Sequence, residues 1–271
     1  MGLSTAPTAP TVPADPPAPV MVGRAYLSFV DTFRRTWRGS AATMFGVPVL
    51  QLLAFGYGLG HLIGRTNGPV EGVTYVAFLA PGLVAASAMQ TALEEATWSV
   101  MAAIKWQRTY HAMLATPLTA GQILLSHLLW AATMVAMSTA VLLLVIAVLG
   151  LGTGWLVLAL PAAVLVGLAF AAPAMAMTAR SEDTQSLTYL YRFGVVPLFL
   201  FSGTFFPISQ LPAWLERLAW VTALWHGVAL CRDLVLGRVG WFDLVHVGYL
   251  LALLAAGLLL ADRAFRRRLV V

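Results

Sequence analysis

Long apolar runs are the feature that most constrains the fold of this chain. The run at residues 121–149, for example, contains no Asp, Glu, Lys or Arg. A helix of about 20 apolar residues crosses the hydrocarbon core of a bilayer, whereas a membrane barrel would show alternating segments of about 10 residues. Only 10% of the residues are charged, against about 25% in soluble domains. The sequence therefore predicts an all-α integral membrane protein.

Six segments are predicted to span the membrane. Their approximate ranges are 43–62, 74–98, 121–149, 155–178, 187–206 and 243–262. Together they form one transmembrane domain over residues 23–271. The preceding residues, 1–22, are rich in Pro and Ala and have neither a basic start nor an apolar core. They are therefore predicted to form a disordered tail rather than a secretory signal.

Residues 23–40 carry a helical pattern before the first span. Apolar side chains such as Phe33 recur at three- and four-residue spacing, and basic residues occupy the opposite side. This pattern predicts an N-terminal amphipathic helix in the membrane interface, with Arg34, Arg35 and Arg38 as anchors at the headgroups. A core helix of a soluble protein is the alternative.

The distribution of basic residues predicts the orientation in the membrane. Six spans place both termini on one side, and 12 of the 16 Lys and Arg residues fall on that side. The remaining four are Arg65, Arg217, Arg232 and Arg238. By the positive-inside rule, both termini are expected in the cytoplasm and the protein in the cytoplasmic membrane. The orientation in the membrane thus explains the excess of basic over acidic residues, and no nucleic-acid partner is expected.

Residues 207–240 lie on the outer side in this topology, although they are mostly apolar. They contain two helical patterns, each too short to cross a bilayer. A re-entrant helical hairpin that dips into the outer leaflet is predicted. One more full span is the alternative, but the charges of Arg217, Arg232 and Asp233 argue against it.

The sequence offers little for catalysis or metal binding. A P-loop places its lysine after a glycine-rich turn, and no glycine-rich turn precedes the single lysine, Lys105. The chain therefore lacks a Walker A site, so any ATP and Mg would be bound by another chain. The histidines show no metal-ligand spacing and there is one cysteine, so no metal or cofactor is expected. Glu94 and Glu95, near the inner end of the second span, are candidates for gating or are simply solvated carboxylates.

Three motifs occur in order along the chain: FLAPGL within residues 75–98, AMLATPLT within 110–130 and FSGTFFPISQLP within 200–237. Together they resemble the permease subunits of type-2 ABC exporters, especially the nodulation-factor-export and daunorubicin-resistance branch. The resemblance covers residues 23–265. It implies six spans, an interfacial N-terminal helix, an outer re-entrant hairpin, and a dimer with a second permease copy or paralogue. It also implies separate ATPase subunits on the cytoplasmic face.

The resemblance places a coupling helix, which would contact the ATPase, between the second and third spans. The corresponding residues are Tyr110, His111, Ala112, Met113, Leu114, Ala115, Thr116 and Pro117. Its Ala-Met-Leu sequence offers a compact apolar surface, and Pro117 is expected to end the helix. Lys105 and Arg108 would anchor the segment at anionic headgroups. An ordinary interfacial loop is the alternative.

These expectations combine into ATP-driven export of an amphipathic or lipid-like substrate, such as a drug, glycolipid or polyketide. Candidate residues for the substrate path, equally explained by packing, are Met89, Phe199, Phe201, Phe205 and Phe206. The alternatives are an ATP-independent channel or transporter, a membrane enzyme, and a non-transporting assembly subunit. The chain itself is not expected to be an enzyme.

Overall fold

The computed structural model describes residues 17–60 and 68–269, and most of these residues are helical. Four helices are long and apolar enough to cross a membrane: Tyr75–Trp106, Ala120–Val148 (α5), Leu156–Arg180 (α6) and Trp241–Leu269 (α11). Two bent helix pairs raise this number to at most six. The prediction of an all-α chain with several spans is thus confirmed for the described residues.

The helix Tyr75–Trp106 contains two stretches of wider π-helical turns. It comprises α3 (Tyr75–Glu94), then η2 (Glu95–Ser99) and η3 (Ala102–Trp106). The helix therefore continues well beyond residue 98, where the second span was expected to end. Lys105, which was assigned to the following loop, belongs to the last turn of this helix.

The N-terminal part of the chain forms one bent helix. Helix α1 (Ala18–Leu53) is followed by the π-helical stretch η1 (Ala54–Leu59). It bends by 50° between Ala18–Gly39 and Met44–Gly58, and a Gly–Ser pair at residues 39–40 is a common cause of such kinks. One expectation is corrected, because residues 18–22 are helical. The helical segment over 23–40 continues directly into the first expected span. Residues 1–16 and 61–62 lie outside the described residues.

The fifth expected span, 187–206, is shorter in the structure. Three short helical segments follow one another here: α7 (Gln185–Tyr189), η4 (Leu190–Val195) and α8 (Val196–Phe201). The helix ends because Gly203 adopts a positive φ of 81° two residues later, a conformation typical of helix ends. Phe205 and Phe206 therefore lie in the connection to η5 (Ile208–Gln210).

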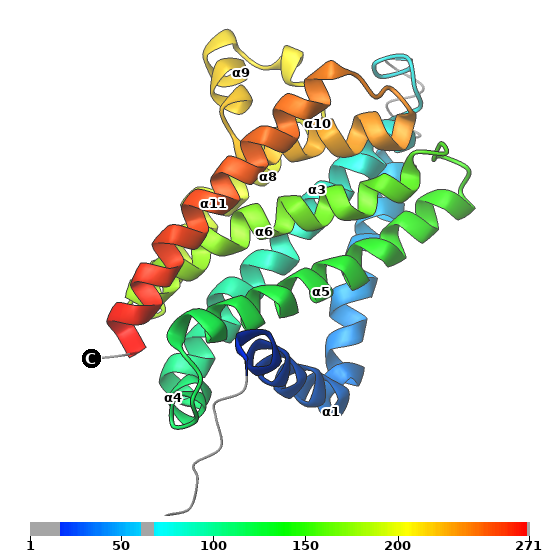
Figure 1. Cartoon of the computed structure of the whole chain (residues 1–271). Helices are drawn as coiled ribbons and strands as arrows, with labels where there is room; N and C mark the ends of the chain where they lie inside the picture. Colours follow the sequence, from blue (N-terminus) through cyan, green and yellow to red (C-terminus); the bar gives the residue numbers. More distant parts are fainter. Residues whose placement is uncertain (1–16, 61–67, 270–271) are drawn as a thin grey trace, which may run out of the picture.

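Two helices follow at one end of the molecule. Helix α9 (Ala213–Trp220) and helix α10 (Ala223–Leu236) meet at 79°. They lie at the opposite end from α4 (Thr109–Leu114) and the first half of α1, whereas α11 runs between the two ends (Figure 1). The basic segment that closes the chain is helical through Leu269, with Arg266 Nε 2.8 Å from Asp262 Oδ2.

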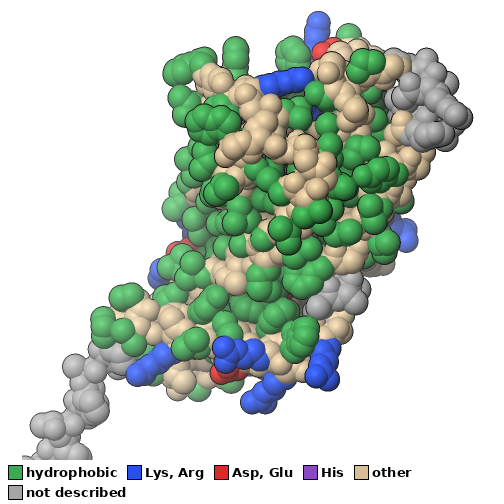
Figure 2. Space-filling view, turned by 90° about the vertical axis from the view of Figure 1, so that its right-hand side faces the viewer, with side chains coloured by type: hydrophobic (Ala, Val, Ile, Leu, Met, Phe, Trp, Pro, Cys, Tyr) green, Lys and Arg blue, Asp and Glu red, His purple; other side chains and the backbone are tan. Residues whose placement is uncertain are grey.

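Helix α6 occupies the centre of the bundle and packs against α3, α5, α10 and α11. Small residues allow this close packing, since nine alanines and one glycine of α6 itself are buried. On the outside, hydrophobic side chains cover the middle of the molecule (Figure 2). Basic side chains gather at the end that holds α4 and the first half of α1 (Figure 2). This distribution suits a helix bundle surrounded by lipid.

Candidate functional site

Helix α4 connects the helix Tyr75–Trp106 to α5 through two sharp turns. Arg108, which precedes α4, has a φ of 53° in the left-handed region, and this separates α4 from the helix before it. The helix ends at Leu114 with Ala115 as its C-cap, and Pro117 follows two residues later, a common position for a proline because it cannot continue a helix. At the start of α5, Thr119 Oγ1 accepts a hydrogen bond from the backbone N–H of Gln122. The Gln122 side chain accepts from the Thr119 N–H in return, forming a capping box.

The side chains of the α4 segment divide into one buried group and one exposed face. Tyr110 is fully buried, and Met113 and Leu114 are half-buried against the core. The exposed residues are His111, Ala112, Ala115, Thr116 and Pro117. Of the apolar Ala-Met-Leu sequence, Ala112 alone is therefore exposed, and it also lines the large cavity described below.

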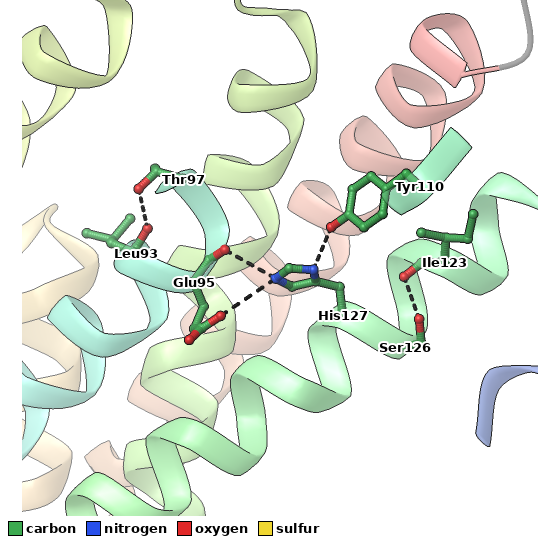
Figure 3. Close-up of polar contacts among 7 residues, drawn as sticks. All are labelled: Leu93, Glu95, Thr97, Tyr110, Ile123, Ser126 and His127. Carbon is green, nitrogen blue, oxygen red and sulfur yellow. Dashed lines mark hydrogen bonds and ion pairs between the residues drawn. The ribbon is translucent and has the colours of Figure 1, made fainter. Parts of the chain in front are cut away.

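A hydrogen-bonded cluster connects Tyr110 to the helix Tyr75–Trp106 (Figure 3). His127 Nε2 lies 3.2 Å from the backbone carbonyl oxygen of Glu95. Because a carbonyl oxygen only accepts, Nε2 carries the hydrogen, and Nδ1 of the neutral ring is then an acceptor. The Tyr110 hydroxyl, 2.5 Å from Nδ1, donates to it. Burial raises the pKa of Tyr110 well above its usual value, so the hydroxyl keeps its proton.

Three more side chains surround this cluster. The Phe29 ring of α1 meets the His127 ring edge-on, with centroids 4.9 Å apart. The Tyr110 ring lies 5.8 Å from that of Phe265 in α11. The Glu95 carboxylate Oε2 is 3.8 Å from His127 Nε2. Side chains from α1, η2, α4, α5 and α11 therefore meet around the Tyr110–His127 pair.

A cavity of about 1290 Å³ opens beside the cluster. It lies between both halves of α1, the helix Tyr75–Trp106, α4 with the turn that follows it, and α5. Glu94 and Glu95 both line it, together with Arg24, Trp98 and Met113. Carboxylates, an arginine and aromatic rings thus share one cavity next to α4.

The other expected site residues are placed apart from this cavity or at its outer surface. Arg34, Arg35, Arg38, Lys105 and Arg108 are all exposed at the end of the molecule that holds α4.

The residues expected along a substrate path are not brought into one site. Met89 is fully buried in the core, and Phe201 is exposed. The Phe199 and Phe205 rings meet edge-on at 4.9 Å. Phe205 and Phe206 line a second cavity of about 320 Å³, near the end that holds α9.

His127 is the site residue that sequence reasoning missed, because the histidines were considered only as metal ligands. Its position within the apolar run 121–149 was an available signal. A polar side chain inside a membrane segment requires a partner within the protein.

Comparison with known proteins supports the resemblance noted above. Residues 25–236 match a family model described as ABC-2 type transporter. Nodulation protein J of Rhizobium leguminosarum bv. viciae is 35% identical over 253 residues, which cover 90% of this chain and 96% of the relative. Nodulation protein J of Bradyrhizobium diazoefficiens is 34% identical over 261 residues, covering 93% and 98%. The prediction of a permease is confirmed: this multi-pass membrane protein belongs to the ABC-2 type transporter family.

Proposed function

We propose that this chain is the permease subunit of an ATP-driven exporter and that a separate ATPase subunit docks on α4. The observation that carries this proposal is the exposed face of α4 and of the turn that follows it, formed by His111, Ala112, Ala115 and Thr116. This face lies at the end of the molecule where basic side chains gather (Figure 2). A short helix with small exposed side chains fits a cleft on a partner protein. The ATPase subunit binds ATP and Mg, because this chain has no Walker A motif.

The basic end is proposed to face the cytoplasm. Arg34, Arg35, Arg38, Lys105 and Arg108 are exposed there and would contact anionic headgroups. This orientation agrees with the positive-inside rule, by which basic residues are more frequent on the cytoplasmic side. In this orientation six segments cross the cytoplasmic membrane, and α9 with α10 forms a re-entrant hairpin on the outer side. Both termini then lie in the cytoplasm.

The substrate is proposed to be amphipathic or lipid-like, for example a drug, glycolipid or polyketide. It would pass between this permease and a second copy or paralogue. The large cavity beside α4 combines charged and aromatic side chains, including Glu95 and Trp98, and would accept such a molecule from the cytoplasmic side. Phe205 and Phe206 would meet it near the outer hairpin.

Binding of the ATPase subunit to α4 is tested with a matched pair of substitutions. Ala112→Asp adds a charge to the exposed face of α4, and Ala213→Asp makes the same change on exposed α9 at the opposite end. The two variants are co-expressed with the ATPase subunit of the same transporter, and the permease is purified by a tag. We expect Ala112→Asp to lower the co-purified ATPase about tenfold, equivalent to about 1.4 kcal/mol of binding free energy.

Ala213→Asp should retain the amount of ATPase seen with the unsubstituted chain. Equal recovery of the ATPase with all three chains would contradict docking on α4. Loss of the ATPase with both variants would also contradict it, since the effect would then not depend on the position of the charge.

A further inference from the structure

We propose that Tyr110 and His127 form a mechanical link that transmits movement of α4 to Glu95 on the wall of the large cavity. The link rests on the proposed function, because it assigns the residues through which a docked ATPase would act. It connects the exposed face of α4 to the cavity through two hydrogen bonds.

The first part of the link is the narrow attachment of α4 to the bundle. Tyr110 is the one residue of α4 that is fully buried, and residues 105–108 and 115–117 on either side of α4 are exposed. Met113 and Leu114 add partial contacts with the core. Apart from the backbone at its two ends, α4 is therefore joined to the rest of the protein mainly through the Tyr110 side chain.

The second part is His127, whose ring has a fixed partner on each nitrogen. Nδ1 accepts from the Tyr110 hydroxyl, and Nε2 donates to the Glu95 carbonyl oxygen at 3.2 Å. Phe29 packs edge-on against the same ring. Because hydrogen bonds depend on direction as well as distance, the ring cannot turn or shift without moving both partners.

The third part is the segment that receives the movement. Glu95 is the first residue of the π-helical stretch η2, and η3 follows shortly after it. Such wide turns are less regular than α-helix and often occur at functional sites. A helix interrupted by them changes shape more readily than a uniform α-helix. Glu95 also lines the cavity with Glu94, so a shift of η2 would move both carboxylates there.

A purely structural role and a link make different predictions for Tyr110→Phe. The phenylalanine ring retains the packing against Phe265 but cannot donate to His127. If the link exists, loss of the Tyr110 hydroxyl stops the transmission of movement from α4 to Glu95, even when the protein still folds and still binds the ATPase. Tyr26→Phe is a matched control, because the Tyr26 hydroxyl bonds to Thr133 at 3.1 Å between α1 and α5 and does not involve α4.

The experiment follows movement at the cavity directly. Glu94→Cys introduces an exposed thiol next to Glu95, and the single native cysteine, Cys231, is fully buried. The thiol is labelled with bimane in the full permease–ATPase complex, and emission is recorded before and after trapping ATP with vanadate. This labelled chain is compared with the same chain carrying Tyr110→Phe, His127→Leu, His127→Gln or Tyr26→Phe. ATP hydrolysis and co-purified ATPase are measured in each sample.

We expect Tyr110→Phe to reduce the ATP-dependent emission change roughly fivefold, the effect of losing one buried hydrogen bond. His127→Leu loses both hydrogen bonds and should reduce the change at least as much. ATP hydrolysis and ATPase binding should persist. His127→Gln, which keeps an N–H donor near the Nε2 position, should restore part of the change, and Tyr26→Phe should leave it intact.

An unchanged signal in Tyr110→Phe would overturn the link while leaving the proposed function standing. An equal loss in Tyr26→Phe would also overturn it. Absence of any ATP-dependent change in the complex that carries the label at Glu94→Cys and no other substitution, with the ATPase bound, would overturn the link together with coupling through α4. Failure of the ATPase to co-purify with any chain would instead contradict the proposed function itself, and the link with it.

Discussion

The guanidinium carbon of Arg232 in α10 lies over the ring of Phe78 in α3, 3.9 Å from the ring centre. Arg232 Nη2 also donates to the backbone carbonyl of Gly203 at 2.8 Å, just beyond α8, and to that of Phe78 at 3.4 Å. One side chain therefore joins α10 both to α3 and to the connection that follows α8. The planar guanidinium makes this possible, because it stacks on a ring and donates in the plane at the same time.

Arg232→Lys should weaken this junction although it keeps the positive charge. The ammonium group cannot stack and donate to two carbonyls in the same geometry. We expect a loss of about 1–3 kcal/mol in unfolding free energy, the cost of a buried polar contact left unsatisfied. Thermal melting in detergent measures it, with Arg217→Lys on exposed α9 as the control. Identical melting of the Arg232→Lys and unsubstituted proteins would show that the junction contributes nothing.

Gly257 marks the closest approach of α11 to α6. A Cβ atom at this position would lie 2.5 Å from Pro173 Cδ and 2.7 Å from the Pro173 backbone nitrogen. Gly257→Ala should therefore force α11 away from α6 and lower the unfolding free energy by about 1–3 kcal/mol, as overpacking does. At Gly248, on the same helix, an added Cβ has no neighbour within 4 Å. Gly248→Ala should melt at or above the temperature of the unsubstituted protein, and equal melting of both variants would contradict the close packing.

Much of the fold was predictable because apolar runs determine where helices lie in a membrane. The run at 121–149 and the helix α5 (Ala120–Val148) differ by one residue at each end. For the segment 155–178, α6 begins at Leu156 and continues to Arg180. Hydropathy predicts the ends of these helices well because each apolar run is bounded by residues that are not strongly apolar.

Hydropathy could not predict where helices extend, bend or stop short. The helix ending at Trp106 continues through polar residues, since an α-helix need not end where the membrane does. Helix α1 bends by 50° between Ala18–Gly39 and Met44–Gly58, and hydropathy carries no signal for the angle of a bend. The fifth segment ends at Phe201 because Gly203 adopts a positive φ, although apolar residues such as Phe205 continue the run.

The candidate site was predictable only in part. The position of α4 came from the resemblance to known permeases, and the exposed charges around it from the sequence. The contacts of Tyr110 and Glu95 with His127 join residues 17 and 32 positions apart. Such contacts depend on how α5 packs against the helix Tyr75–Trp106, and no local pattern encodes that packing.

The central claim is that α4 faces the cytoplasm and is covered there by an ATPase subunit. Accessibility of a single thiol tests both parts together. Ala112→Cys places a thiol on the exposed face of α4, and Ala213→Cys places one on α9 at the opposite end. The unsubstituted chain controls for labelling of Cys231, which is buried.

Labelling by a membrane-impermeant maleimide is measured in intact cells and in inside-out vesicles, with and without the ATPase subunit. We predict that Ala112→Cys reacts only in inside-out vesicles and that bound ATPase suppresses the reaction about tenfold or more, as expected for a site occupied well above its Kd. Ala213→Cys should react in intact cells and be unaffected by the ATPase. Reaction of Ala112→Cys in intact cells, or equal reaction in vesicles with and without the ATPase, would contradict the account.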